Sequence, residues 1–231
     1  MQFCYARLNP NGEQAMRTDT AHRKWNETWQ SEDGRRAWSQ ADPDVLACAT
    51  SVISAGGADA LDLGSGVGRH ALALARMGFN VDALDGSEVG IAQLRKDAES
   101  ERLSVRTHHG VMTELPFADA SFDYLLAFNV IYHGDPEILA ATIAEISRVL
   151  RQGATLQLTM LSKRNVNYGV GEEIAPNTFV VKDASDDKVH PHFYCNAGEL
   201  VALLPGFELK GLVDREQKPG HWHWHVVAEK L

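Results

Sequence analysis

With 231 residues, 44% of them hydrophobic and 23% charged, the chain can form one sizeable core and has the composition of an ordinary globular domain. Its net charge of −9 gives no electrostatic footprint for nucleic acid or an anionic membrane, and three separated cysteines suggest neither a disulfide framework nor a zinc site. Because no apolar run approaches the roughly 20 residues that span a bilayer and no signal peptide is evident, we expect a cytoplasmic protein without nucleic-acid or membrane partners.

The N-terminal part predicts a leader followed by helices. Residues 1–18 are polar and aperiodic, and we expect them to be disordered. Three tryptophans then stand among charged residues, which favours amphipathic helices with a covered aromatic face. They are Trp25, Trp29 and Trp38. We expect residues 19–55 to form a helical lid on a single domain that spans residues 19–231, although plain packing of an N-terminal helix on the sheet explains the tryptophans slightly better.

From residue 60 onward, strands and helices alternate. The expected strands cover residues 60–63, 80–84, 103–107, 122–128 and 155–161, and the helices between them cover 68–77, 89–100 and 135–150. This alternation predicts a parallel sheet between helices. Residues 207–213 and 221–229 predict a C-terminal antiparallel hairpin. We therefore expect an α/β fold with a doubly wound, seven-stranded, mostly parallel sheet.

Residues 162–192 interrupt this alternation. The segment is rich in Asn, Gly, Asp and Pro, and it is too long for an ordinary connection in a compact domain. Loops of this length are often lids or binding loops. We expect this insert to help cover a cleft, and a capping-box pattern at Asn196 and Glu199 to begin a short helix after it.

A glycine loop joins the first strand to its helix in the segment LDLGSGVGRH, residues 61–70. Gly64, Gly66 and Gly68 permit a tight turn and close approach of a ligand. A dinucleotide fingerprint would place its third glycine at position 69, which is Arg69, so the spacing disfavours NAD. Asp62 would repel a pyrophosphate but suits a ligand with an ammonium and a sulfonium, such as S-adenosylmethionine. The alternative is a tight turn without a ligand.

An acid ends the second expected strand. Asp85 stands about 20 residues beyond the glycine loop, where a carboxylate can accept hydrogen bonds from both ribose hydroxyls. The alternative is that Asp85 only caps the following helix. Together the loop and the acid favour an adenosyl cofactor.

Four segments carry a family resemblance: LDLGSGVGRH, VDALDGS, ELPFADASFDYLLAFNVIYH and EISRVLRQGATLQL. They resemble successive signature segments of class I S-adenosylmethionine-dependent methyltransferases, closest to the branch with the type 11 and tellurite-resistance-like enzymes. The resemblance covers residues 58–161 and, more loosely, the last 35 residues. It implies a Rossmann-like fold, S-adenosylmethionine as cofactor and methyltransferase activity.

The resemblance also implies cofactor contacts. Asp62 and the backbone from Gly64 to Gly68 would hold the methionine part, and Asp85 the ribose. The further implied contacts are Ser65 in the loop, Gly86 and Ser87 at the adenine edge, and Phe128 and Asn129 on the sulfonium side. Many family members have an acid after the third strand to bind adenine. Because Val111 stands there in this chain, we expect backbone groups of Val111 and Met112 to recognise adenine.

His133 and Tyr132 are the candidate catalytic residues. They follow the strand over residues 122–128, at the carboxyl edge of the sheet where open α/β folds bind ligands. We expect His133 to contact the acceptor or to act as a base, with Tyr132 as the second candidate. An equal alternative is that His133 only supports the following helix, and Tyr132 is readily explained by packing.

Histidines of the last strand and one tryptophan are the expected substrate-binding residues. His221, His223 and His225 share one strand face, and the first two lie nearest the cleft, together with Trp29 from the lid. Such histidines, with His190 and His192 before the hairpin, could also form a metal site. Since no acidic ligand stands at an obvious spacing, we favour a substrate pocket and expect no metal.

The expected function is methyl transfer to a small-molecule acceptor, either a metabolite or a metalloid oxyanion, by a monomer or homodimer. A non-catalytic regulatory protein that binds S-adenosylmethionine is the alternative. Turnover would distinguish the two.

Overall fold

The computed structural model describes residues 18–231, so the expected disordered leader lies, except for Thr18, outside the described residues. The helices are α1 (His22–Thr28), α2 (Glu32–Arg36), α3 (Pro43–Ser54), α4 (Arg69–Arg76), α5 (Glu88–Glu101), α6 (Pro136–Val149), α7 (Ala197–Ala202) and the 3-10 turn η1 (Asp187–Val189). The strands are β1 (Asp59–Leu63), β2 (Asn80–Asp85), β3 (Val105–His109), β4 (Phe122–Ala127), β5 (Leu150–Ser162), β6 (Glu172–Ala175), β7 (Thr178–Val180), β8 (His192–Cys195), β9 (Phe207–Lys218) and β10 (His221–Lys230).

The sheet has the doubly wound order. Its first five strands run parallel in the order β3-β2-β1-β4-β5, and the chain reverses its direction of travel along the sheet between β1 and β4. Strand β10 pairs antiparallel with β5, and β9 pairs with β10. Ligands of open α/β sheets bind at the carboxyl edge beside such a reversal. The α/β class, the parallel sheet and the C-terminal hairpin are confirmed.

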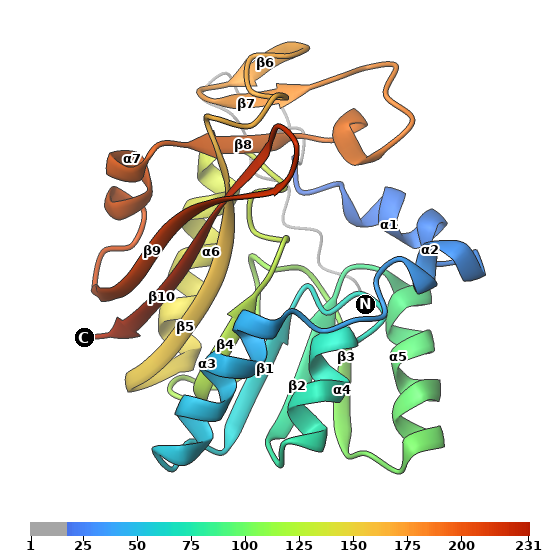
Figure 1. Ribbon diagram of the computed structural model, residues 1–231, viewed down its shortest axis with the longest axis vertical. Helices are drawn as coiled ribbons and strands as arrows, with labels where there is room; N and C mark the ends of the chain where they lie inside the picture. The colour runs from blue at the N-terminus through green and yellow to red at the C-terminus, as the bar shows by residue number, and fades with distance from the viewer. Residues whose placement is uncertain (1–17) are drawn as a thin grey trace, which may run out of the picture.

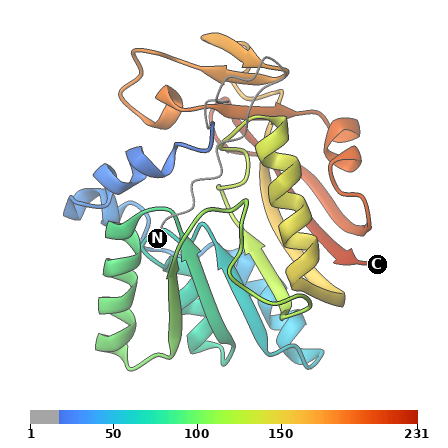
Figure 2. The same cartoon turned by 180° about the vertical axis from the view of Figure 1, so that it is seen from behind.

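Alternating strand residues build a core on each face of the sheet. Val81, Tyr124 and Leu126 pack with α3, α4 and α5, whereas Leu61 and Leu125 pack with α6 and α7. Figure 1 shows α3 and α4 on one face, and Figure 2 shows α6 on the other. Both faces of the parallel strands are therefore covered, as the near-continuous apolar strand sequences require.

Side-chain caps begin the expected helices. Asp42 and Asp135, each followed by proline, accept hydrogen bonds from the first turns of α3 and α6. Asn196 and Glu199 form the predicted capping box at α7.

The expected count of seven strands is wrong for residues 18–231, in which the sheet has ten. The seven expected strands are present, and residues 162–195 contribute β6, β7 and β8. Strand β5 makes this addition possible because it continues past its last pair with β4, Ala127 with Leu158. Leu161 then pairs with His223 on one edge and with Tyr194 of β8 on the other. The insert thus uses backbone groups that a shorter β5 would not offer.

Within residues 18–231, no helix combines the length and the apolar character that crossing a bilayer demands.

Substitutions at two glycines separate the cost of crowding the core from the cost of left-handed backbone strain. Gly68 has a φ of +89°, and a Cβ there would lie 2.1 Å from Leu94 Cδ1, whereas Gly153 has a φ of +76° with nothing within 4 Å of its Cβ position. We expect Gly153→Ala to cost about 1–2 kcal/mol of unfolding free energy from left-handed strain alone. Gly68→Ala should cost roughly 1–3 kcal/mol more because it overpacks the core. Urea unfolding measures both, and equal losses would contradict the packing role of Gly68.

Candidate active site

A pocket opens at the carboxyl ends of β1 to β4, where the order of the sheet reverses. It holds about 920 Å³ of empty space, part of it open to solvent. Its walls come from the loops after β1, β2, β3 and β4 and from the segment over residues 19–38. A volume of this size, at this edge, is typical of a small-molecule or cofactor site.

The glycine loop forms the floor of the pocket. Gly64 and Gly66 have φ values of +72° and +55°, which favour glycine, and they line the pocket with Ser65. A Cβ on Gly66 would lie 3.1 Å from the ring of Trp29, so a side chain would fill the space between loop and tryptophan. Gly68 does not line the pocket; it caps α4 and packs on Leu94.

Asp85 connects two of these loops. Its Oδ2 accepts a hydrogen bond from the Gly66 amide at 2.8 Å, and its Oδ1 accepts one from the Ser87 amide at 2.7 Å. Burial raises the pKa of Asp85, and these two bonds oppose the rise. Since a carboxylate has about four lone-pair sites, acceptor capacity remains for ribose hydroxyls. Asp85 lines the pocket, as expected, and also organises the loop.

Several buried polar atoms at the pocket have no partner within the described residues. They are Trp29 Nε1, Ser65 Oγ and Asp62 Oδ2. Asp62 is not a lining residue, but its carboxylate lies close enough to the lining residues Arg69 and Asp85 for both charges to affect it. Burial raises the pKa of Asp62 to about 7. Unpaired buried groups are costly, and a bound ligand with an ammonium and hydrogen-bonding groups would satisfy them.

The loop after β3 forms the expected adenine end. Val111 and Met112 line the pocket next to Gly86. Ser87 does not: its hydroxyl accepts from the Gly90 amide at the start of α5 and donates to Asn26 Oδ1. Ser87 therefore caps a helix and holds the N-terminal segment.

The N-terminal segment covers the pocket. Trp25 and Trp29 stack with ring centroids 5.0 Å apart, and Trp38 packs edge-on against Trp25 at 5.1 Å. All three rings line the pocket, and Trp29 is only 5% exposed. Thr20 Oγ1 lies 2.9 Å from His190 Nδ1 of the insert, so the two expected cover segments meet.

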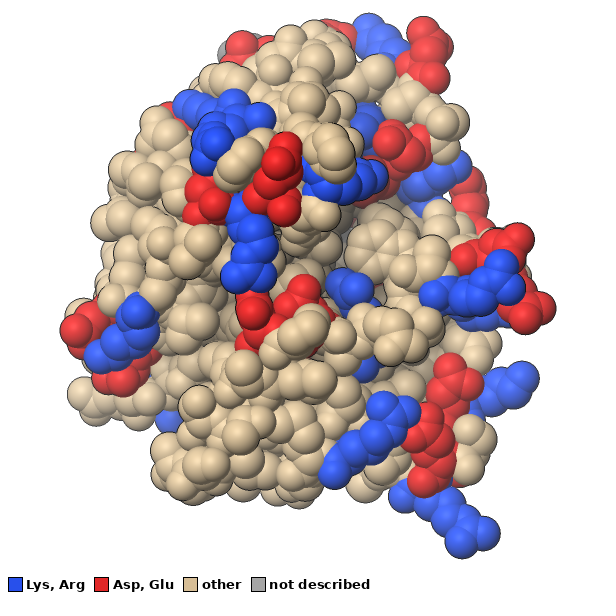
Figure 3. All heavy atoms as spheres, viewed as in Figure 1, with Lys and Arg blue, Asp and Glu red and all other residues tan. Residues whose placement is uncertain are grey.

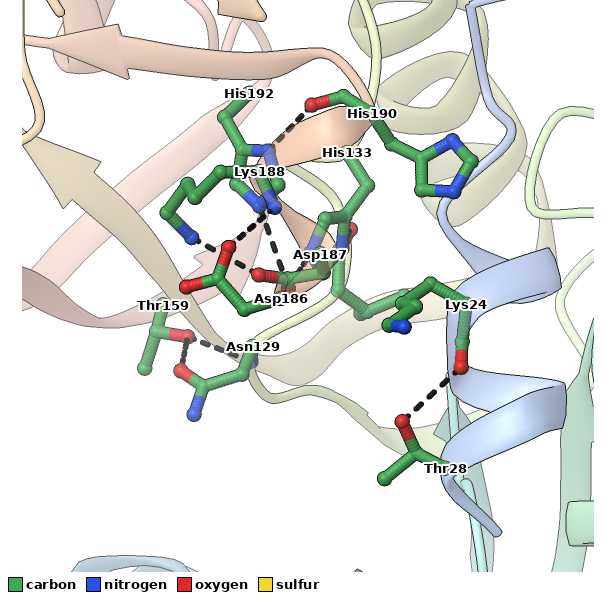
Figure 4. A network of polar contacts seen from close by, with 11 residues as sticks. Lys24, Thr28, Asn129, His133, Thr159, Asp186, Asp187, Lys188, His190 and His192 are labelled. Carbon is green, nitrogen blue, oxygen red and sulfur yellow. Dashed lines mark hydrogen bonds and ion pairs between the residues drawn. The ribbon is translucent and has the colours of Figure 1, made fainter. Parts of the chain in front are cut away.

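The other end of the pocket is formed by the loop after β4. Phe128 and Asn129 line it, as expected, and the Asn129 amide donates to Thr159 Oγ1 at 2.7 Å. His133 also lines it, with its Nδ1 2.8 Å from the Val130 carbonyl and its Nε2 3.3 Å from Asp187 Oδ2 (Figure 4). Both nitrogens of His133 thus face protein oxygens.

Tyr132 lies behind this wall and is not a lining residue. It is 6% exposed, and burial raises the pKa of its hydroxyl well above the ordinary value, so the phenol stays protonated. His223 packs beside Tyr132 at 6.1 Å between ring centroids, and neither His223 nor His221 lines the pocket. Of the expected substrate-binding residues, only Trp29 does.

Three residues in or beside the pocket were not singled out by the sequence as candidate site residues. Arg69 lies 4.9 Å from the Trp38 ring centroid and 5.5 Å from that of Phe128, and His22 packs over Gly86. Asp187 approaches His133 from the insert. Arg69 follows the glycine loop directly and could have been found by position, whereas His22 and Asp187 come from segments without a recognisable pattern.

A family model for a methyltransferase domain matches residues 60–153, which include the glycine loop and Asp85. A Mycolicibacterium smegmatis protein named as a probable S-adenosylmethionine-dependent methyltransferase is 31% identical over 175 residues, which are 75% of this chain and 58% of the relative. The chain thus spans about half the length of the curated relatives that it matches.

Solved structures share the fold. An S-adenosylmethionine-dependent methyltransferase from Methanosarcina mazei superposes with a TM-score of 0.63 at 25% identity, over 75% of this chain and 92% of that one. TehB from Haemophilus influenzae gives a TM-score of 0.62 at 18% identity, over 83% and 63%. Together with the glycine loop and the sheet order, the family match and these similarities identify residues 60–153 as a methyltransferase domain of the class I S-adenosylmethionine-dependent type.

Proposed function

We propose that this protein transfers the methyl group of S-adenosylmethionine to a small-molecule acceptor. The observation that carries the proposal is the convergence, at one pocket, of the glycine loop, the Asp85 carboxylate and the unpaired polar atoms of Trp29 and Ser65, with the unpaired Asp62 oxygen buried close to the lining residues Arg69 and Asp85. These groups fit a ligand with an ammonium, a ribose and an adenine.

When bound, S-adenosylmethionine supplies an electrophilic methyl group on a sulfonium, a good leaving group. The chain's own contribution is then to bind and orient. Gly64 to Gly66 leave room for the methionine part, Asp85 accepts from the ribose, and backbone groups of Val111 and Met112 face the adenine. Orientation alone can lower a barrier of this kind by roughly 7–11 kcal/mol. The tryptophans of residues 25–38 exclude water from the same space.

The acceptor would occupy the end of the pocket between the N-terminal segment and His133. The polar lining residues there, Asp19, Arg69, Asn129 and His133, stand among aromatic rings, which suits a compact acceptor with a few polar groups. On the face shown in Figure 3, basic and acidic side chains are interspersed, without a continuous basic area that would follow a nucleic-acid backbone. This supports a small molecule as acceptor. We assign contact with the acceptor to His133, which lines this end of the pocket, rather than to Tyr132, which does not.

Cofactor binding and turnover test the proposal. Calorimetry should show S-adenosylmethionine and S-adenosylhomocysteine binding in the micromolar range, about −8 kcal/mol, and no heat with NAD. With methyl-labelled cofactor and a pool of metabolites, S-adenosylhomocysteine should accumulate and label should appear in one acceptor.

NAD binding without S-adenosylmethionine binding would overturn the proposal. Cofactor binding without label transfer, across fractionated pools, would favour the non-catalytic regulatory protein instead.

Asp85→Ala should weaken S-adenosylhomocysteine by roughly 1.5–3 kcal/mol, because bonds to a charged acceptor are lost and the Gly66 amide loses its partner. Asp82→Ala is the matched control: Asp82 lies on the same strand and binds Arg106 and His108 outside the pocket. It should lower stability but leave affinity unchanged. If both variants bound the ligand like the wild type, Asp85 would only hold the Gly66 and Ser87 amides in place.

The affinity for S-adenosylhomocysteine should depend on pH through Asp62. The pKa of this carboxyl, about 7 in the free protein, means that a ligand ammonium must displace a proton below that pH. At pH 6 about one molecule in ten carries the carboxylate, so Kd should rise about tenfold between pH 8 and pH 6. Calorimetry in buffers of different ionisation enthalpy should show proton release at pH 6.

Asp62→Asn should bind weakly at both pH values and lack this dependence. A wild-type Kd that stayed constant from pH 8 to pH 6 would show that Asp62 does not bind the ligand ammonium.

A further inference from the structure

A cluster of metal-binding side chains lies behind the acceptor end of the pocket. His133, Asp187 and His192 each offer a ligand atom, and these atoms lie within 4.8 Å of one another. The residues come from the loop after β4, from η1 and from β8, and their side chains point toward one another in Figure 4. Among residues 18–231, the hairpin histidines form no such group.

The two distances from Asp187 agree with a shared ion. Asp187 Oδ2 lies 3.3 Å from His133 Nε2 and 3.4 Å from His192 Nε2. Two ligands of a tetrahedral zinc ion, with bonds of about 2.0–2.1 Å, are separated by about 3.3–3.4 Å. His192 Nε2 is buried and makes no hydrogen bond within the described residues.

The hydrogen-bonding groups at this point would be satisfied by added positive charge. His133 Nδ1 lies 2.8 Å from the Val130 carbonyl, and His192 Nδ1 lies 2.8 Å from the His190 carbonyl. Each ring therefore stands between a carbonyl oxygen and the Asp187 carboxylate, and both of these only accept. A neutral imidazole has one N–H, so two ring nitrogens are left facing an oxygen without a proton. Two further protons or one divalent cation would resolve this.

Burial favours the cation over the protons. His192 is fully buried and His133 is 6% exposed, and two imidazolium charges side by side would repel each other and lose their hydration. One divalent ion would contact all three ligand atoms without placing a positive charge on each of two adjacent rings. Histidine ligands of metals usually donate their other ring N–H to a carbonyl or carboxylate, and both rings are placed to do so.

The neighbouring charges permit a cation. Lys188 Nζ lies 3.1 Å from Asp187 Oδ1, the oxygen that the histidines do not face. Asp186 accepts from the Lys188 amide, so the two carboxylates and the ammonium together keep a net charge of −1 beside the two rings.

We propose that His133, Asp187 and His192 bind one divalent ion of the zinc class. Two imidazoles and one carboxylate suit zinc and the neighbouring first-row ions better than magnesium or calcium. Three protein ligands leave a coordination position open. Because His133 also lines the pocket, the ion would lie directly behind the acceptor wall and would tie the insert to the loop after β4. This revises the expectation of a site without metal and does not depend on methyl transfer.

Metal content and stability test the proposal in the full chain. Protein stripped with a chelator and then dialysed against zinc should retain about one zinc per chain by mass spectrometry, and zinc should raise its Tm. Cobalt in place of zinc should give visible absorption bands.

Asp187→Asn, which keeps the shape of the side chain, and His133→Gln should each weaken zinc by more than about 100-fold, since even the loss of an outer-shell partner costs 10–100-fold. His109→Gln, at an exposed histidine outside the cluster, should bind zinc like the wild type. His223→Gln should also retain it, which separates this site from the hairpin histidines. Circular dichroism and S-adenosylhomocysteine binding confirm that each variant is folded.

A wild-type protein that is folded but retains no zinc would overturn the proposal. So would retention of zinc by both Asp187→Asn and His133→Gln, or its loss in His223→Gln alone. None of these results depends on an acceptor, so failure of the proposed methyl transfer would be seen separately.

Discussion

The Asp85 carboxylate is the contact on which the geometry of the pocket depends. Its two oxygens hold the Gly66 amide of the loop after β1 and the Ser87 amide of the loop after β2. Ser87 in turn holds Asn26 of α1, so the cover over the pocket is connected to the same point. A buried carboxylate is costly unless it is hydrogen-bonded, and these amide bonds offset that cost in a position where a ribose can use the remaining acceptor sites.

In the N-terminal segment over the pocket, Trp29 both packs against the core and lines the pocket. Trp29 packs on Gly66 and Gly90, where any side chain on either glycine would crowd its ring. Its Nε1 nevertheless has no partner within the described residues. The N–H of a buried tryptophan usually has a hydrogen-bond partner. Trp29 therefore packs against the glycine loop and lines the pocket at the same time, while the lid interpretation of this segment stays a prediction.

The sequence predicted the parts of the fold that repeat a local pattern. Strands β1 to β5 and helices α4 to α6 follow from apolar periodicity and from the glycine loop, each of which acts within a few residues. The insert could not be predicted in the same way. Strand β8 exists because β5 offers a free edge beyond β4, and this edge depends on strand lengths set by distant residues. For the same reason the sequence did not predict Asp187 as a partner of His133, which lies 54 residues earlier in the chain.

The two ends of the pocket therefore differ in how their chemistry is encoded. At the proposed cofactor end, Gly64, Gly66 and Asp85 lie in backbone geometry that the parallel sheet imposes, and short motifs suffice to find them. At the acceptor end, residues 19–38 and 162–192 meet over the loop after β4, with Thr20 against His190 and Asp187 against His133. Loops carried by a rigid scaffold can change without disturbing the core. The proposed acceptor end is thus built by segments that the fold positions but does not determine, and under this proposal the specificity for a substrate would reside there.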